Sequence, residues 1–382
     1  MKKIVLITEV MEKGVGKHIM DLFTFFSGDP NIDISVLYGS SRVEPQFQKI
    51  IENNKDKFIK VNNLKRNIGF NDIKSIFEIL EILKDINPNV VHCHSSKAGL
   101  SGRIASKLMK IKNVYYSPHA YFFLKYKNKS FKRKLFLFAE KVLSRRCTKC
   151  TIATSKGEQN AYVNNHIDMP EKCIMIEHGV EIPKIAKKDL QKYRQQYGID
   201  DCQILIGTMA RLEYQKDPIT TIKIMQGIVE VSENVACIIF GDGSMKEVII
   251  KMYNEIPEIY RKRIIIAGET TTPELSIASL DIYLTTSLYE GLPYTLLTAL
   301  GYQKPILATN VEGNRDCVVD GINGFLFNPG DYITAVEIYK KMVNQSKLIE
   351  KMAQESKNIY TQRFSMDEMK HKYQELYLEV PN

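Results

Sequence analysis

Two short segments hold the residues best suited to chemistry. In residues 207–216, Arg211 and Lys216 follow an apolar run, and in residues 287–298, Glu290 comes just before a Gly-Leu-Pro turn that is expected to open a helix. Two fixed cations beside a helix N-terminus can cradle a diphosphate without a metal ion. The adjacent carboxylate can accept hydrogen bonds from hydroxyl groups on whatever the diphosphate carries. Together these residues predict a nucleotide-sugar site.

The turn after Glu290 supplies the backbone part of this predicted site. Gly291 permits close approach of a ligand to the backbone, and Pro293 suits the first position of a helix. The amides expected to face a phosphate at this helix start are those of Leu292, Tyr294 and Thr295. A simpler interpretation is that Glu290 only interacts with the helix dipole. That interpretation does not explain the pair of cations after the earlier strand.

Length and composition limit the class of protein. The chain has 382 residues, and single cores rarely grow beyond roughly 250–300 residues, so two domains are expected. A hydrophobic content of 44% with 25% charged residues is typical of a globular protein. Glu9 closely follows the short apolar run 4–7, which predicts no signal peptide, and no apolar run is long enough to span a bilayer. These features predict a cytoplasmic protein.

Cysteine and histidine patterns predict neither a metal site nor a cofactor. Seven cysteines scattered through a long chain are typical of reduced thiols. Cys147 and Cys150 form a lone C-x-x-C with no second pair to complete a zinc site. His92 and His94 share one face of a strand end, but the sequence offers no third ligand beside them.

The positive charge is concentrated in one window, residues 121–150. The window holds ten Lys and Arg residues against Glu140 alone, an excess of +9 that equals the formal charge of the whole chain. Apolar residues recur there at helical spacing, with cations between them: Phe131, Leu135, Phe138 and Val142, with Lys132, Arg133, Lys134, Lys141 and Arg145. A nucleic-acid binder would spread its charge over a face. The pattern favours an anionic membrane surface, and the alternative is a core helix with a basic outer side.

The order of elements predicts an α/β fold made of two Rossmann-like, doubly wound domains that face each other across a cleft. Apolar runs predict strands, separated by helical patterns, at 4–7, 34–38, 90–94, 114–117, 151–154, 204–208, 235–240, 263–267, 282–285 and 305–308. The polar stretch 181–201 is interpreted as the join. We therefore expect an acceptor-binding domain over 1–180, with the C-terminal helical segment 362–382 packing back on it, and a nucleotide-sugar-binding domain over 181–361.

Along nearly its whole length the chain resembles the retaining GT-B glycosyltransferases of family 4, in particular the bacterial capsule and exopolysaccharide members. The resemblance rests on the order and spacing of several short motifs. They are Gly14-Val-Gly-Lys-His18, Val90-Val-His-Cys-His-Ser-Ser-Lys-Ala-Gly99, Gly102-Arg103, Ser117-Pro-His-Ala120, Glu177-His-Gly-Val180, Arg211 with Lys216, Phe240-Gly-Asp-Gly243, Glu290-Gly-Leu-Pro293, Gly313-Asn-Arg-Asp316 and Asp320-Gly-Ile-Asn-Gly324.

The resemblance implies a role for each matching position. Arg211 and Lys216 would hold the donor diphosphate, and Glu290 would contact sugar hydroxyls. His119 would lie near the transferred sugar. Gly14 and Gly16 would let the first loop approach the phosphates or the acceptor, and the loop glycines Gly241 and Gly243 would approach the donor. The chain departs from the family at Thr298, where a second glutamate usually binds the ribose, because one hydroxyl cannot clamp two ribose hydroxyls as a carboxylate does.

The expected function is transfer of a sugar from a nucleotide-diphosphate donor, with UDP favoured, to a polyprenyl-diphosphate-linked saccharide in capsule or exopolysaccharide synthesis. The expected enzyme retains the anomeric configuration, needs no metal or other cofactor, binds no nucleic acid and works at the inner face of the cell membrane. Two alternatives stay open. A UDP-sugar 2-epimerase would need paired carboxylates at the sugar carbon, and a non-catalytic partner subunit would agree with Thr298.

Overall fold

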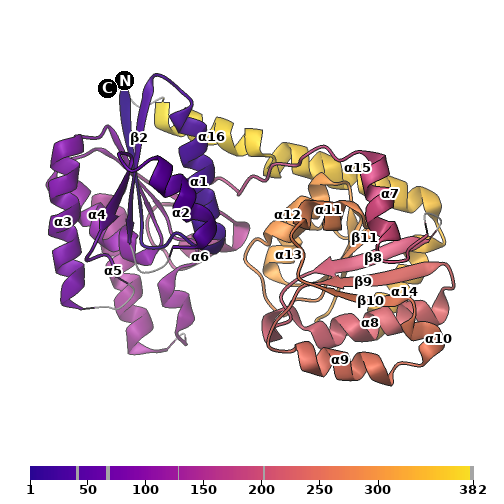
Figure 1. Cartoon of the computed structure of the whole chain (residues 1–382). Coiled ribbons are helices and arrows are strands. Elements are labelled where there is room, and N and C mark those ends of the chain that lie inside the picture. Colours follow the sequence, from indigo (N-terminus) through magenta and orange to yellow (C-terminus); the bar gives the residue numbers. More distant parts are fainter. Residues whose placement is uncertain (40–42, 66–68, 128, 201–202, 379–382) are drawn as a thin grey trace. The chain divides into compact units, whose positions relative to one another are not determined.

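The chain forms two α/β units, each built on its own parallel sheet (Figure 1). The computed structural model describes residues 1–39, 43–65, 69–127, 129–200 and 203–378. Internal contacts divide the chain into a first unit, Met1–His178 with Met369–Asn382, and a second unit, Gly179–Glu368. The expected boundaries after residues 180 and 361 lie close to these divisions. The predicted α/β class with two Rossmann-like sheets is confirmed.

The first sheet has seven parallel strands in the order β3-β2-β1-β4-β5-β6-β7. The strands are β1 (Lys2–Thr8), β2 (Ile32–Gly39), β3 (Phe58–Val61), β4 (Val90–His94), β5 (Asn113–Ser117), β6 (Cys150–Ala153) and β7 (Cys173–Met175). The strand order reverses between β1 and β4, where Thr8 pairs with His94. Such a switch point is where open α/β sheets bind ligands, at the carboxyl ends of the strands.

The second sheet has six parallel strands in the order β10-β9-β8-β11-β12-β13. The strands are β8 (Ile204–Met209), β9 (Val235–Phe240), β10 (Ile264–Gly268), β11 (Ile282–Thr285), β12 (Ile306–Thr309) and β13 (Gly324–Phe327). Here the order reverses between β8 and β11. β9 is buried on both faces, because Val235, Cys237 and Ile239 lie in one hydrophobic core and Ala236, Ile238 and Phe240 in another.

Helices connect the strands and cover the faces of each sheet (Figure 1). In the first unit they are α1 (Lys13–Ser27), α2 (Pro45–Asn53), α3 (Phe70–Ile86), α4 (Ser96–Leu108), α5 (Phe131–Cys147) and α6 (Lys156–Asn164). In the second they are α7 (Lys187–Gln195), α8 (Pro218–Val231), α9 (Lys246–Glu255), α10 (Glu258–Arg261), α11 (Pro273–Ala278), α12 (Tyr294–Gly301), α13 (Glu312–Cys317), α14 (Tyr332–Val343) and α15 (Ser346–Ile359). Among the described residues, no helix combines the length and the apolar character needed to cross a bilayer.

The C-terminal helix α16 (Met366–Leu378) enters the first unit at Met369. Tyr373 and Tyr377 on this helix are fully buried. The Tyr377 hydroxyl lies 2.5 Å from Nδ1 of His92, and Tyr115 donates a hydrogen bond to the carbonyl of Leu376 at 3.1 Å. The end of the chain therefore helps to build the core under β4 and β5.

Candidate active site

The two strands at the switch point of the second sheet lead into the residues that the sequence singles out. β8 ends at Met209, just before Arg211, and β11 ends at Thr285, before Glu290. Because β8 and β11 are parallel neighbours, both loops leave the same edge of the sheet. Lys216 Nζ forms an ion pair with Glu290 Oε1. The sequence predicts both residues for the site, but it does not predict this contact.

The Glu290 carboxylate is held by further contacts. Its side chain is only 6% exposed, and Ser287 Oγ donates a hydrogen bond to Oε1 at 2.6 Å. Gln215 Nε2 donates to the carbonyl of Tyr289 at 3.0 Å and lies 3.5 Å from Glu290 Oε2. Ser287 and Gln215 were not predicted as site residues. The only sequence signal for them is their place inside the segments 207–216 and 287–298.

Backbone and hydroxyl contacts join the two loops. The amide of Leu288 donates to the carbonyl of Gln215 at 2.8 Å. Thr286 Oγ1 donates to the carbonyl of Lys216 at 2.8 Å and lies 2.7 Å from Thr221 Oγ1, which is on α8. These bonds fix the position of Lys216 relative to Glu290 before any ligand binds.

The glycine turn after Glu290 packs against α13. A β-carbon at position 313 would lie 2.0 Å from the carbonyl oxygen of Gly291, so only glycine fits at 313. A β-carbon at Gly291 itself would meet nothing within 4 Å. Pro293 immediately precedes α12 instead of taking its first helical position. Tyr294 and Thr295 therefore begin the helix and Leu292 lies outside it, a shift of one residue from the expectation.

A cavity of about 420 Å³ lies at the carboxyl ends of β8, β9 and β10. Its lining includes Arg211, Gly241, Asp242, Glu269 and Thr295. Gly241 has a φ of +135°, and a β-carbon there would lie 1.9 Å from the carbonyl oxygen of Ala210. A β-carbon at Gly243 would lie 2.5 Å from that of Leu212. Both glycines are thus explained by close packing of the β8 and β9 loops, and donor contact at either stays a prediction.

Thr298 lies on α12, and its hydroxyl donates to the carbonyl of Tyr294 at 3.0 Å. The hydroxyl proton of Thr298 is therefore donated within its own helix. Glu269, in contrast, is an exposed carboxylate on the lining of the neighbouring cavity. The structure therefore offers a second carboxylate at this end of the sheet that the sequence comparison with the family does not indicate.

Gly14 and Gly16 lie in the first turn of α1, which begins at Lys13. The expectation that Gly14 and Gly16 lie in a loop is therefore wrong. A β-carbon at Gly16 would lie 2.7 Å from the ring of Phe47 and 2.8 Å from the backbone of Met11. Close helix packing accounts for Gly16, and contact of either glycine with a donor stays a prediction.

Family models match both halves of the chain. The model described as Glycosyltransferase Family 4 matches residues 13–183, and the one described as Glycosyl transferases group 1 matches residues 189–359. The chain belongs to the family 4 GT-B glycosyltransferases.

Relatives of this glycosyltransferase include enzymes of polysaccharide synthesis. It is similar to the Escherichia coli UDP-Gal:alpha-D-GlcNAc-diphosphoundecaprenol alpha-1,3-galactosyltransferase, with 26% identity over 330 residues that cover 84% of this chain and 83% of the relative. The Staphylococcus aureus capsular polysaccharide biosynthesis glycosyltransferase CapM is 21% identical, over 88% of this chain and 87% of CapM. Anabaena HepE, solved in complex with UDP, superposes with a TM-score of 0.81 and 19% identity over the whole of both chains.

His119 of the glycosyltransferase lies just past β5 with a φ of +48°, and Ala120 follows with a φ of +89°. Two consecutive residues other than glycine in this region indicate backbone strain of the kind that collects at functional sites. His119 Nε2 lies 3.0 Å from His94 Nδ1. Burial lowers the pKa of His119 well below its usual range, and His178 and His92 add to the effect. His119 is therefore a neutral imidazole at pH 7.

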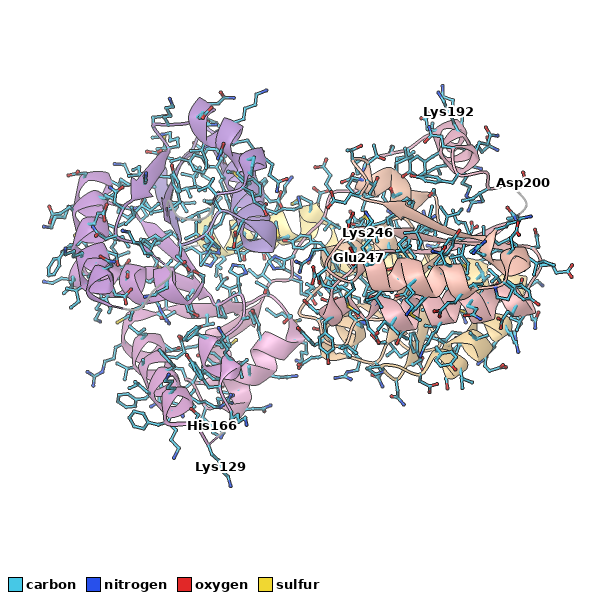
Figure 2. All side chains as sticks on the ribbon, turned by 60° about the horizontal axis from the view of Figure 1, so that its bottom comes forward. Lys129, His166, Lys192, Asp200, Lys246 and Glu247 are labelled. Carbon is cyan, nitrogen blue, oxygen red and sulfur yellow. The ribbon has the colours of Figure 1, made fainter. Side chains whose placement is uncertain are left out.

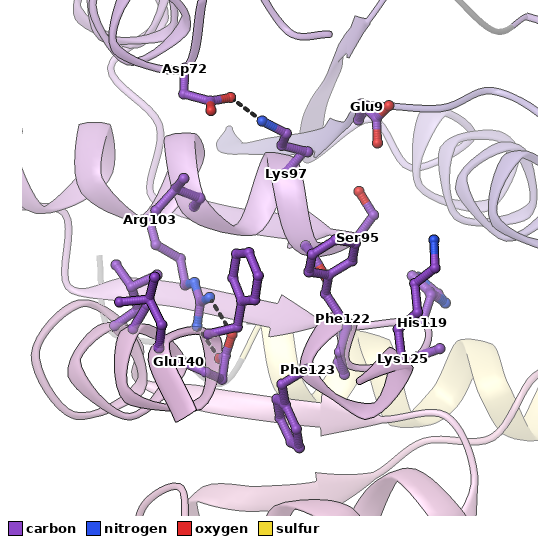
Figure 3. A pocket seen from close by; sticks show the side chains of 18 residues that line it. Glu9, Asp72, Ser95, Lys97, Arg103, His119, Phe122, Phe123, Lys125 and Glu140 are labelled. Atoms are coloured by element: carbon purple, nitrogen blue, oxygen red, sulfur yellow. Dashed lines mark hydrogen bonds and ion pairs between the residues drawn. The ribbon is translucent and has the colours of Figure 1, made fainter. Parts of the chain in front are cut away.

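A second cavity, of about 470 Å³, lies in the first unit beside the ends of β4 and β5. Figure 3 shows His119 and Lys125 toward one end of this cavity and the pair Arg103 and Glu140 toward the other. The Arg103 guanidinium donates two hydrogen bonds to Glu140, of 2.7 and 3.0 Å. The sequence did not predict this pair. Its signals were Gly102-Arg103 among the motifs and Glu140 as the one acid in the basic window.

Residues 131–147 of the basic window form α5, which keeps an apolar stripe in contact with solvent. The exposed fractions are 78% for Phe131, 51% for Leu135, 65% for Phe138 and 36% for Val142. Lys132 and Lys134 are exposed, and Lys129, which precedes the helix, projects from the surface in Figure 2. Arg133 differs, because it is half-buried over the ring of Phe123 and donates to Asn165 Oδ1 at 3.3 Å. The alternative of a core helix with only a basic outer side is wrong for this stripe.

Proposed function

We propose that the enzyme transfers a sugar from a UDP-linked donor to a polyprenyl-diphosphate-linked saccharide, with retention of the anomeric configuration and without a metal ion at the donor. The observation that carries the proposal is the fixed arrangement of Lys216, Glu290 and Ser287 at the switch point of the second sheet. Arg211 lines the adjacent cavity at the same edge. The UDP in the HepE complex and the UDP-Gal and diphosphoundecaprenol in the name of the E. coli relative support the substrate class.

The charges of these residues suit the bond that must break. Departure of the sugar leaves negative charge on the diphosphate, and Arg211, Lys216 and the amides at the start of α12 would stabilise that charge. Glu290, fixed by Ser287, would accept hydrogen bonds from sugar hydroxyls and orient the ring. The leaving phosphate can itself take the proton of the acceptor hydroxyl on the same sugar face. No covalent intermediate with the protein is required.

We propose that Glu269 binds the ribose hydroxyls of the donor, because Thr298 cannot bind both of them. It lines the cavity that also contains Arg211 and Thr295, whereas the Thr298 hydroxyl is bonded within its own helix. A carboxylate can accept from both ribose hydroxyls at once. Glu269→Gln is expected to raise the KM for the donor several-fold with little change in kcat, since the ribose does not react.

α5 is proposed to bring the enzyme to the cytoplasmic face of the membrane, where such an acceptor lies. Phe131 and Phe138 lie seven residues apart on one stripe, so both can enter the lipid interface together. Lys134 and Lys141 follow the same spacing along one side of the stripe and would contact anionic headgroups. An acceptor with a polar head group and an apolar lipid chain can bind at such a surface.

Donor binding tests the proposal directly. UDP-sugar titrated into the purified enzyme by calorimetry should bind with the same affinity in EDTA and in Mg²⁺, because Arg211 and Lys216 replace the metal. Arg211→Gln should weaken binding, while Arg261→Gln, a cation on α10, serves as the control. NMR of the product formed with a lipid-linked acceptor should show the donor's anomeric configuration. Binding that requires Mg²⁺, or an inverted product, would contradict the proposal.

The alternatives give different results in the same assay. A 2-epimerase would convert the UDP-sugar without any acceptor. A non-catalytic partner would bind UDP and release no product with any acceptor lipid.

A further inference from the structure

All seven histidines of the chain lie in the first unit, and five of them are close together. His18 lies on α1, His92 and His94 on β4, His119 after β5, and His178 after β7. The rings of His18, His94, His119 and His178 form a group in which each described pair of ring centres is 4.7–5.7 Å apart. Among these four, the family resemblance gives a role to His119 alone, near the transferred sugar.

Three of these rings offer nitrogens toward a common point. One ring nitrogen from each of His18, His94 and His119 lies within 4.8 Å of the other two. Four-coordinate zinc places its ligand nitrogens about 3.3 Å apart, given zinc–nitrogen bonds of about 2.0–2.1 Å. His94 Nδ1 and His119 Nε2 are already 3.0 Å apart. The His18 nitrogen, which lies within 4.8 Å of the other two, would reach the same separation only if its ring moved.

The present hydrogen bonds leave this group incomplete. His94 is fully buried, and within the described part of the chain its Nε2 has no hydrogen-bond partner. A neutral imidazole carries one N–H and one lone pair, so either tautomer of His94 leaves a buried ring nitrogen unpaired. Such a group costs free energy in the absence of a ligand. Nδ1 and Nε2 point from opposite sides of the ring, so an ion beside His119 would be bound by His94 Nδ1, and Nε2 would need a separate partner.

The type of ligand limits the choice of metal. All three residues are imidazoles, which bind a metal through a ring lone pair. Neutral imidazole ligands suit Zn²⁺, Cu²⁺, Ni²⁺ and Co²⁺ and not Mg²⁺ or Ca²⁺.

We propose that His18, His94 and His119 bind one divalent transition-metal ion of the Zn²⁺ class. Three imidazoles leave the fourth position of such an ion open, and because His119 lines the 470 Å³ cavity, that position would face the cavity (Figure 3). His18 now contacts Tyr373 Oη through Nε2 and His178 Nδ1 through Nδ1, both at 3.2 Å. Metal binding would replace one of these two hydrogen bonds, and the other would orient the ring.

The proposed site would supply a metal ligand set that the sequence does not predict. The sequence shows His92 and His94 but no third ligand, because His18 and His119 lie 76 residues before and 25 residues after His94. The fold brings them together at the switch point between β1 and β4. The three histidines lie in the first unit, whereas Arg211, Lys216 and Glu290 lie in the second.

Metal binding to the full chain tests the inference without any measurement of activity. Enzyme stripped with a chelator is titrated with CoCl₂ and with ZnCl₂ at pH 7, followed by visible absorption and by elemental analysis after desalting. One Co²⁺ per chain is expected, with the weak visible bands of nitrogen ligation and without thiolate charge-transfer bands. His94→Gln and His119→Gln should each weaken binding at least tenfold. His371→Gln, on the exposed part of α16, is the matched control and should bind as the wild type does.

Two results would overturn the inference. One is the absence of stoichiometric binding to the wild type. The other is binding that survives His119→Gln but is lost in a Cys147→Ser/Cys150→Ser variant, which would place the metal at the C-x-x-C. Circular dichroism shows whether the buried His94→Gln variant folds, and the half-buried His119 supplies the second variant.

Discussion

Lys216 and Glu290 form an ion pair across 74 residues of sequence, between the loops that follow two neighbouring strands. The carboxylate is almost fully buried and the ammonium largely so, with exposed fractions of 6% and 19%. In the proposed mechanism the Lys216 cation binds the diphosphate, and the Glu290 carboxylate binds the sugar hydroxyls. The pair therefore keeps both groups in position before the donor arrives.

Coupling between Lys216 and Glu290 can be measured with a double-mutant cycle. Lys216→Met leaves a buried carboxylate without its cation, so it should destabilise the fold more than Lys216→Met/Glu290→Gln does. We expect an interaction energy of about 1–3 kcal/mol in urea unfolding. Additive effects of the two single changes would show that the pair is not coupled in solution.

The buried Arg103–Glu140 pair should matter greatly for stability. Arg103 is 1% exposed, so Glu140→Gln leaves an uncompensated guanidinium in the core of the first unit. A loss of about 3–5 kcal/mol in the free energy of unfolding is expected. Glu81→Gln is the control, because Glu81 pairs with Lys84 on the exposed side of α3 and should cost less than about 1 kcal/mol. Equal losses for the two variants would contradict the buried pair.

Lys304 should make stability depend on alkaline pH. Burial lowers its pKa to about 8, and its ammonium donates to the carbonyls of Ala278 and Leu280. The unfolded lysine has a pKa of about 10.4. Between these values the unfolded state binds more protons, so this residue adds stability as pH rises from 8 to 10. The unfolding free energy of the wild type minus that of Lys304→Met should therefore increase from pH 8 to pH 10. A constant difference would contradict the lowered pKa.

The apolar stripe of α5 should govern binding to anionic vesicles. Phe131→Ser/Phe138→Ser removes two exposed rings, each worth up to about 1.5–3 kcal/mol when buried. Sedimentation with phosphatidylglycerol vesicles should show at least tenfold weaker partitioning. Phe77→Ser is the matched control, because Phe77 is also exposed, on α3 of the same unit. Equal binding of the two variants would contradict a role of the α5 stripe in membrane binding.

The sequence predicts the central strands well, because a strand that is buried on both faces consists of a continuous run of apolar residues. Val235–Phe240 and Val90–His94 were predicted with the bounds that the structure shows. The strands that were missed, β3, β7 and β13, lie at sheet edges and have only three or four residues. Length alone is not the reason, because the four-residue strands β6, β11 and β12 were predicted, and these lie inside their sheets.

Contacts between distant residues could not be predicted in the same way. The sequence gives Arg211, Lys216 and Glu290 as a group because each follows a strand, but which loops touch depends on the strand order. The Lys216–Glu290 pair requires β11 to lie beside β8, and the histidine group requires β4 beside β1. The need for glycine at 313 likewise follows only from the nearby carbonyl of Gly291.

Nucleotide release from a panel of sugar donors tests the central claim most directly. UDP-, GDP- and TDP-sugars are incubated with the enzyme and a membrane lipid extract, with wild type and Glu290→Gln side by side. We predict release from a UDP-sugar that depends on the lipid fraction and falls about 10²–10³-fold in Glu290→Gln, the loss typical of one fixed transition-state contact. Donor binding without turnover across the whole panel, or turnover unchanged in Glu290→Gln, would contradict the account.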